Sequence, residues 1–184
     1  MTRAAAQDLL DHHPHVDAGV DEVQALLDAC TPRAAPQGAQ LCAEGDPGDE
    51  LWFVIEGRVQ ILKRDLLGVQ RPMGEVEAPT LLGQMGIIDR ARRSATCVAA
   101  SPVRLAVMDR ATYSALVREL SGRGVALRRL LLSSLTLQLV EGNGRLRALS
   151  QRAADEETAS VDPVLDERLL AAAGALQGWA AAPR

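Results

Sequence analysis

The sequence predicts a mainly β fold with flanking α-helices, an antiparallel sandwich or jelly roll. Residues 38–109 hold short β-type runs separated by turn sequences, and many short strands at this spacing are typical of such folds. From residue 110 onward, the apolar residues recur at helical spacing instead. A length of 184 residues favours one domain with added helices over two full domains.

Residues 1–37 are predicted to form two short N-terminal helices, at 4–10 and 21–29. Apolar residues of the second helix recur at i, i+3 and i+4, so they fall on one face. Pro32 and Pro36 then end the helical structure, because proline removes a backbone donor and restricts the residue before it.

The strands of the β segment are identified by their apolar pattern. Residues 51–55 are a continuous apolar run, as expected of a buried strand, whereas residues 58–63 alternate as a half-buried strand does. A hairpin tip is predicted at 65–68. Two more strands are predicted at 94–99 and 103–108.

Residues 110–152 are predicted to form two helices after the strands. In the second, from about residue 125, apolar residues step alternately by three and four, which is the a/d seam of a coiled coil. We expect this seam to be a homodimer interface, and its leucines are Leu132, Leu135, Leu139, Leu146 and Leu149. Leu130, Leu131 and Leu137 lie off the seam and offer a second apolar face to the β domain.

Residues 153–163 are polar and acidic and are predicted to be a linker. Residues 164–184 repeat the three- and four-residue steps, which predicts one short amphipathic tail helix. The tail either packs back on its own domain or docks on another protein, and both readings stay open.

Charge and composition narrow the function classes. The net charge is −4, yet residues 90–147 carry eleven arginines against three acids, which suggests a place for an anion. Aromatic residues make up only 2% of the chain, which argues against a base-stacking nucleic-acid platform. No apolar run approaches the roughly 18 residues that a membrane span needs.

The cysteines and histidines predict neither a disulfide framework nor a metal site. Cys30, Cys42 and Cys97 are odd in number and far apart, which fits a reduced cytoplasm. The N-terminus lacks the apolar centre of a signal peptide. The three histidines are His12, His13 and His15, and they could hold a metal. We interpret them instead as a solvent-exposed turn around Pro14, because the sequence offers no matching pair of ligands elsewhere. We expect no metal and no cofactor.

Residues 81–98 contain the candidate ligand-binding residues. Gly83 lets the backbone bend close to a ligand, and the turn that follows can point its free N–H groups at an anion. Arg93 follows ten positions later with a permanently charged fork that suits a phosphate, and Ser94 adds a hydroxyl. The simpler alternative is that Arg93 only pairs with a surface acid such as Asp89.

This ordered set resembles the cyclic-nucleotide-binding domain family, which includes the sensory half of catabolite-activator-type regulators. The resemblance covers residues 20–150 and rests on four segments in order: Gly45-Asp46, Leu51 to Gly57, Leu82 to Ile87, and Arg93-Ser94-Ala95-Thr96 with Ala99. It implies an eight-stranded antiparallel jelly-roll barrel, followed by a long helix, with a phosphate-binding cassette at residues 82–96.

The resemblance also implies a ligand set. Arg93 would bind the cyclic phosphate, and Ser94 the phosphate or the base. Gly83 and the backbone N–H groups after it would line the ribose-phosphate, and the long helix would close over the base and form the dimer. The implied residues are Gly83, Gln84, Met85, Gly86, Arg93, Ser94 and Ala95, with Thr136 and Gln138 on the helix.

Two departures from the family pattern bear on affinity. Gln84 stands where the family has Glu, so the ribose hydroxyl loses a charge-assisted bond, which costs about 1–2 kcal/mol, or roughly 5- to 30-fold in affinity. Pro79-Thr80 replaces the usual Gly-Asp. In addition, 34 residues follow Ser150, fewer than a winged helix-turn-helix needs, so we expect no direct DNA binding.

The sequence therefore predicts a stand-alone regulatory protein in the cytoplasm that senses a cyclic nucleotide, cAMP or cGMP. It would signal to an unidentified protein partner through its C-terminal helices, with no membrane contact. One alternative is a degenerate, ligand-independent adaptor that keeps the fold for protein–protein assembly. Another is electrostatic binding of nucleic acid by the Arg-rich segment. An enzyme is not expected, because no His, Cys or paired carboxylates accompany the cassette in a catalytic order.

Overall fold

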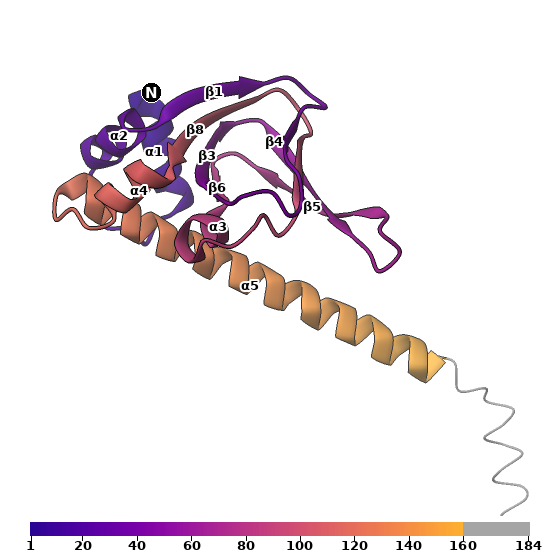
Figure 1. The fold of residues 1–184 in the computed structure, drawn as a ribbon. Coiled ribbons are helices and arrows are strands. Elements are labelled where there is room, and N and C mark those ends of the chain that lie inside the picture. The colour runs from indigo at the N-terminus through magenta and orange to yellow at the C-terminus, as the bar shows by residue number, and fades with distance from the viewer. Residues whose placement is uncertain (160–184) are drawn as a thin grey trace, which may run out of the picture. The chain divides into compact units, whose positions relative to one another are not determined.

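A computed structural model describes residues 1–159, which form two antiparallel four-stranded sheets with flanking helices (Figure 1). The strands are β1 (Thr31–Ala35), β2 (Gln40–Cys42), β3 (Glu50–Glu56), β4 (Arg58–Arg64), β5 (Gln70–Glu77), β6 (Thr80–Leu82), β7 (Thr96–Ala99) and β8 (Val103–Asp109). The helices are α1 (Arg3–His12), α2 (Val20–Asp28), α3 (Gln84–Asp89), α4 (Arg110–Leu116) and α5 (Gly122–Ala159). The predicted mainly β fold with eight strands is confirmed.

The sheets have the strand orders β1-β8-β3-β6 and β2-β7-β4-β5. Pro32 lies in β1 and Pro72 in β5, and both strands are outermost in their sheets. Proline is tolerated there because an edge strand leaves one row of N–H groups unpaired. Pro32 and Pro36 were predicted only to end the helical structure, so β1 falls within the segment 1–37 that was assigned to the N-terminal helices. The barrel therefore begins earlier than expected.

Strand β3 is buried on both faces, as its continuous apolar run predicts. Leu51 and Phe53 belong to the core that the helices share, whereas Trp52 and Val54 belong to the core between the two sheets. The alternation follows from the two-residue period of a strand. One sheet therefore separates two apolar cores.

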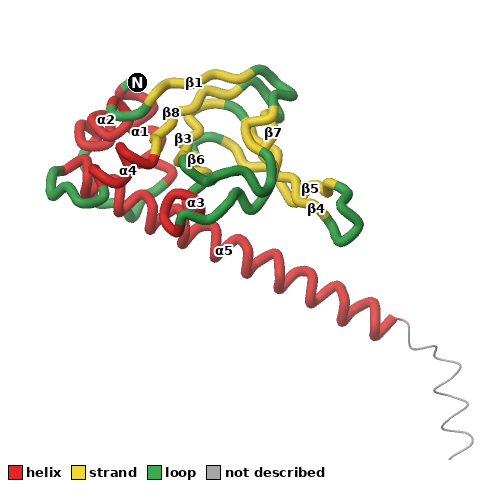
Figure 2. The backbone as a smooth tube through the Cα atoms, viewed as in Figure 1, coloured by secondary structure: helices red, strands yellow, loops and turns green. Residues whose placement is uncertain are grey.

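The helices gather on the outer side of this sheet (Figure 2). Leu26 and Leu27 of α2 contribute to the shared core, together with Leu127, Leu130 and Leu131 of α5. The predicted second apolar face of the long helix is thus used against its own domain. No helix among residues 1–159 combines the length and hydropathy needed to span a bilayer.

Helix α5 is longer than predicted. It runs to Ala159, so residues 153–159 are helical rather than linker. Alanine and glutamate favour helix, and no glycine or proline occurs between Gly144 and Pro163. The chain divides into two compact units, Met1–Leu137 and Gln138–Arg184, which are described separately. The predicted tail helix lies outside the described residues.

Candidate functional site: an arginine over a buried indole

The site begins where β6 ends and α3 starts. Gly83 joins the two elements with a φ of 89°, in the left-handed region that glycine adopts without strain. A Cβ at this position would lie 2.1 Å from Nη1 of Arg93 and 2.7 Å from the carbonyl oxygen of Glu50. Glycine is therefore required both for the turn and for the close approach of the arginine.

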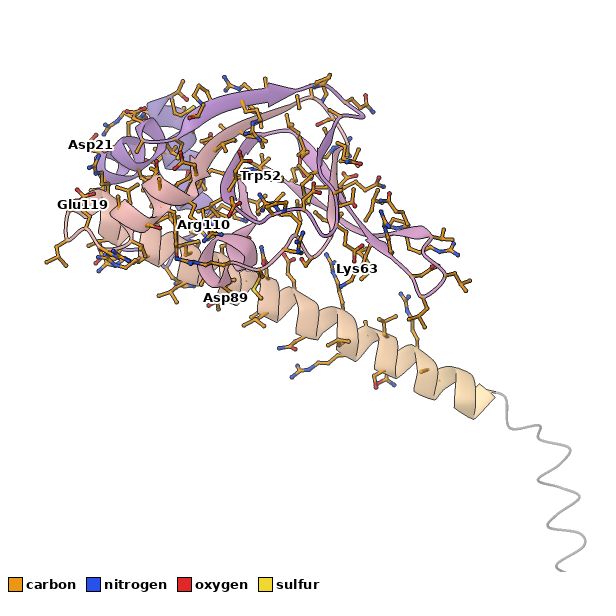
Figure 3. The ribbon with its side chains drawn as sticks, in the orientation of Figure 1. Asp21, Trp52, Lys63, Asp89, Arg110 and Glu119 are labelled. Atoms are coloured by element: carbon orange, nitrogen blue, oxygen red, sulfur yellow. The ribbon has the colours of Figure 1, made fainter. Side chains whose placement is uncertain are left out.

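Arg93 is the buried cation of the site. The residue is only 8% exposed, and its guanidinium carbon lies 4.3 Å from the ring centroid of Trp52. Figure 3 labels Trp52. Nε and Nη1 are buried and have no hydrogen-bond partner among the described residues. Buried polar groups are nearly always satisfied, because leaving a charged donor unpaired costs several kcal/mol. A buried guanidinium with two nitrogens left without acceptors is a candidate anion-binding group.

The nearby acids do not neutralise Arg93. Glu50 accepts hydrogen bonds from both terminal nitrogens of Arg33, at 3.0 and 2.6 Å, and from the indole Nε1 of Trp52 at 2.8 Å. Arg33 and the indole hold the pKa of the Glu50 carboxyl below its usual value. No ion pair joins Arg93 to Asp89 within the described part of the chain, so the simpler alternative of a surface pair is wrong.

The backbone of Arg93 is fixed by the turn after β2. Its N–H donates to the carbonyl of Asp46 at 2.8 Å, and the N–H of Gly45 donates to the Arg93 carbonyl at 2.9 Å. The neighbouring Arg92 donates from Nη1 to the Gly45 carbonyl at 2.7 Å. The Gly-Asp pair of the family pattern thus orients the arginine through main-chain bonds.

Gln84 connects the cassette to α5. Its side chain is buried, and its amide nitrogen donates to the carbonyl of Leu81 at 2.9 Å and to Oγ of Ser134 at 2.8 Å. Both amide hydrogens are committed by these bonds, so Oε1 is the group left to accept a further one. A glutamate here would carry no donor for either partner. The amide therefore donates two hydrogen bonds that the carboxylate usual in the family cannot donate.

Arg110 closes the other side of the cassette (Figure 3). It forms an ion pair with Asp49 at 2.8 Å and donates to the carbonyls of Gly48, Gly86 and Ile87 at 3.0–3.1 Å. Gly86 also packs against Gly48, and a Cβ on either glycine would lie within 2.7 Å of the other's Cα. Gly86 thus allows close backbone packing, and Arg110, one of the arginines of the basic segment 90–147, is bound to the protein itself.

The remaining predicted residues are placed as follows. Met85 is 57% exposed and Ser94 is also exposed, so both side chains lie at the surface of the cassette. The carbonyl oxygen of Ala95 lies 3.7 Å from the Cys42 sulfur. Thr136 donates its hydroxyl to the carbonyl of Leu132 at 2.9 Å, within its own helix.

Ser134, and not Thr136, is the helix residue that reaches the cassette. It is 3% exposed and was missed because the prediction followed the apolar seam, from which Ser134 is one position removed. A serine pair within a leucine-rich helix is the signal that could have drawn attention to it. Gln138 belongs to the second unit, and its predicted role is not assigned by the structure.

The predicted histidine turn is only partly exposed. His13 is buried, and its Nδ1 lies 2.9 Å from Oγ of Ser133, whereas His12 and His15 are exposed. Burial, with a smaller effect from His12, lowers the pKa of His13 to about 4. Within residues 1–159, no group of three His, Cys, Asp or Glu side chains is arranged to hold a metal ion.

Comparison with known proteins identifies this arrangement. Residues 32–119 match the family model of the cyclic nucleotide-binding domain. The chain carries a cyclic nucleotide-binding domain. The match confirms the family that the cassette motif predicted, and it includes Gly83, Gln84 and Arg93.

Curated relatives share this domain within longer proteins. The chain is 33% identical over 100 residues to the cyclic AMP receptor protein of Thermus thermophilus, which covers 54% of this chain and 46% of the relative. It is 38% identical over 80 residues to a cyclic nucleotide-gated potassium channel of Rhizobium etli, which covers 44% of this chain and 21% of the relative. The chain thus spans less than half the length of these relatives.

Solved structures agree with the domain assignment. A cyclic nucleotide-binding domain from Methylobacillus flagellatus superposes with a TM-score of 0.70 at 29% identity, over 79% of this chain and 84% of that one. The catabolite activator protein of Thermus thermophilus gives a TM-score of 0.62 at 30% identity, over 75% of this chain and 62% of that one. The cyclic nucleotide-binding domain and the first part of α5 are therefore similar to known regulatory folds.

Proposed function

We propose that this domain binds a cyclic nucleotide, cAMP or cGMP, and acts as a regulatory sensor. The observation that carries the proposal is Arg93, whose Nε and Nη1 are buried without partners beside Gly83. A phosphate beside Gly83 would give Nη1 the acceptor that it lacks, because a guanidinium is a charged donor suited to oxyanions. No other side chain among the described residues combines a buried cation with open donors.

The rest of the ligand set follows from the same geometry. The backbone of residues 83–86 passes next to Arg93 and would line the ribose-phosphate, with Ser94 at the outer edge. Gln84 would accept the ribose hydroxyl through Oε1, because its amide hydrogens are already used. An amide oxygen is a weaker acceptor than a carboxylate, so we expect affinity below that of a glutamate-bearing relative.

The change caused by ligand binding would be transmitted through α5. The Gln84–Ser134 bond joins the ligand-binding turn directly to that helix, so a ligand that competes for Gln84 changes how the helix is held. Farther along, the seam residues Leu139, Leu146 and Leu149 are 60–67% exposed and would pair with a second copy. We propose a homodimer whose helices report ligand state to a protein partner, with no catalysis by the domain itself.

Calorimetric titration with cAMP and with cGMP tests the binding step. We expect heat with the wild-type protein and none with Arg93→Met. Arg104→Ala is the matched control, since Arg104 on β8 pairs with the exposed Glu56 of β3 and its loss changes the net charge equally. Absence of heat with the wild type at millimolar nucleotide would overturn the sensor role and favour an adaptor that retains only the fold.

A further inference from the structure

Cys42 and Cys97 lie directly opposite each other on neighbouring strands. Cys42 ends β2, Cys97 lies in β7, and the two are register partners in an antiparallel pair. In a regular antiparallel pair, directly opposed residues have Cα atoms about 4.5–5.5 Å apart, inside the range of about 4.4–6.8 Å that disulfides span. The register shifts between Gln40 and Cys42, so the cysteine pair adjoins a local irregularity of the ladder. Both side chains belong to the core between the sheets, so the two thiols face the same interior.

The two sulfurs differ in acidity. A hydrogen bond from Cys97 and the positive charge of Arg93 lower the pKa of Cys42 to about 7, against the effects of burial and of Asp46. The same bond and burial raise the pKa of Cys97. The thiolate is the reactive form of cysteine, so we assign Cys42 as the nucleophile of the pair and Cys97 as the thiol beside it. When protonated, the Cys42 thiol donates to the carbonyl of Ala95 at 3.7 Å, a bond that ionisation removes. Each residue keeps 8% of its surface exposed.

We propose that Cys42 and Cys97 are an oxidation site that forms a disulfide with a hydroperoxide as the oxidant. The Cys42 thiolate attacks one peroxide oxygen, the O–O bond breaks, and Cys42 becomes a sulfenic acid while hydroxide leaves and takes up a proton. The Cys97 sulfur then attacks the Cys42 sulfur and gives its proton to the departing hydroxide. In sum, two thiols are oxidised by one hydrogen peroxide, which is reduced to two waters.

The site adjoins the segment that orients Arg93. Gly45 and Asp46, which exchange backbone bonds with Arg93, follow Cys42 by three and four residues. The Cys42 thiolate is also a negative charge beside Arg93 and competes there with a phosphate, whereas a disulfide is neutral. This consequence rests on the proposed nucleotide binding. At about pH 8 we expect the oxidised protein to bind the nucleotide roughly threefold more tightly than the reduced protein.

Intact-mass spectrometry and peptide mapping after treatment with equimolar hydrogen peroxide test the chemistry. We expect a mass loss of two hydrogen atoms, a linked Cys42–Cys97 peptide, and reversal by dithiothreitol. Cys97→Ser should stop at the sulfenic acid of Cys42, which dimedone traps. Cys30→Ser is the matched control and should form the disulfide like the wild type, since Cys30 lies in the separate helical core.

The chemical and the regulatory parts have separate outcomes. Sulfinic acid, disulfide-linked dimers or an unchanged mass would overturn the oxidation site, whatever the protein binds. A disulfide that forms but leaves nucleotide affinity unchanged would overturn the coupling to Arg93. Failure of the wild type to bind any nucleotide concerns the proposed function alone, because the mass measurement needs no ligand.

Discussion

Arg93 is the residue on which the proposed function depends, and its position is unfavourable for stability. A buried cation with two unsatisfied donors loses its hydration, and the indole of Trp52 compensates only in part. Such a group is expected where binding, rather than folding, has determined the residue. Stability and ligand binding should therefore respond in opposite directions when Arg93 is replaced.

Arg93→Met tests this opposition. Replacement of a buried charge by an apolar side chain of similar length is often neutral or stabilising by about 1–4 kcal/mol, so we expect the free energy of unfolding to be unchanged or higher without ligand. Nucleotide binding should be lost in the same variant. Urea denaturation measures the first and calorimetry the second. A loss of several kcal/mol would instead assign Arg93 a structural role.

Gly83→Ala should destabilise more than a positive φ alone explains. Gly83 and Gly38 have φ values of 89° and 83°, but a Cβ meets Arg93 and Glu50 at Gly83 and nothing within 4 Å at Gly38. Gly38→Ala should therefore cost about 1–2 kcal/mol for the backbone conformation. Gly83→Ala should cost a further 1–3 kcal/mol or so for overpacking. Equal losses in urea denaturation would show that the cassette relaxes around the added methyl group.

At the scale of elements, α5 is held by polar contacts as well as by its leucines. Ser133 bonds to His13 just after α1, and the next residue, Ser134, bonds to Gln84 at the start of α3. Hydrogen bonds between buried groups contribute modestly when made and cost more when one partner is left unpaired. These two contacts therefore add directional restraints to the hydrophobic packing that holds the helix.

The His13 contact makes stability depend on pH. The folded state lowers the pKa of His13 from 6.5 to about 4, so the unfolded chain takes up the proton first as pH falls. The contribution is complete above pH 6.5 and is lost progressively toward pH 4, with a total of about 3 kcal/mol at most.

Urea denaturation from about pH 7 to about pH 5 measures the His13 contribution. The fall in unfolding free energy should be smaller in His13→Gln than in the wild type. His15→Gln, which changes an exposed histidine, should keep the wild-type dependence. Identical pH profiles for all three proteins would show that His13 is not buried in its neutral form.

At the scale of the whole molecule, assembly and fold draw on different leucines of one helix. The leucines in the first turns of α5 are buried in the helical core, whereas those of the seam are exposed. An exposed row of large apolar side chains is typical of an interaction surface. The dimer proposed above would use the exposed leucines, because the buried ones are already packed in the helical core.

Leu139→Asp combined with Leu146→Asp should yield monomers in sedimentation velocity, because a charge at a seam position must be desolvated on pairing. Leu66→Asp combined with Leu67→Asp is the matched control at the tip of the β4–β5 hairpin, where both leucines are at least 85% exposed. The control should remain dimeric. A dimeric seam variant, or a monomeric control, would assign assembly to another surface.

Local sequence was enough to predict part of the fold and part of the site. The roles of Gly83 and Arg93 could be predicted from the order and types of the residues in one short segment. The burial of β3 could be predicted from its unbroken apolar run. Strand β1 could not be predicted, because Pro32 is compatible with a strand only at a sheet edge, and edges are defined by tertiary structure. Ser134 and Trp52 were missed for the same reason, since each acts on a partner at least 40 residues away.

The adjacent serines of α5 also restrict how that helix can move. Neighbouring residues on a helix point about 100° apart, so the His13 and Gln84 bonds are made in different directions around the helix axis. A helix held at one such point can still roll about it, whereas one held at two can neither roll nor slide while both bonds persist. Loss of the bond to Gln84 alone would leave α5 held by the Ser133 bond and its buried leucines, with one restraint on its rotation removed. The nucleotide binding proposed above would then be transmitted as a rotation of the helix.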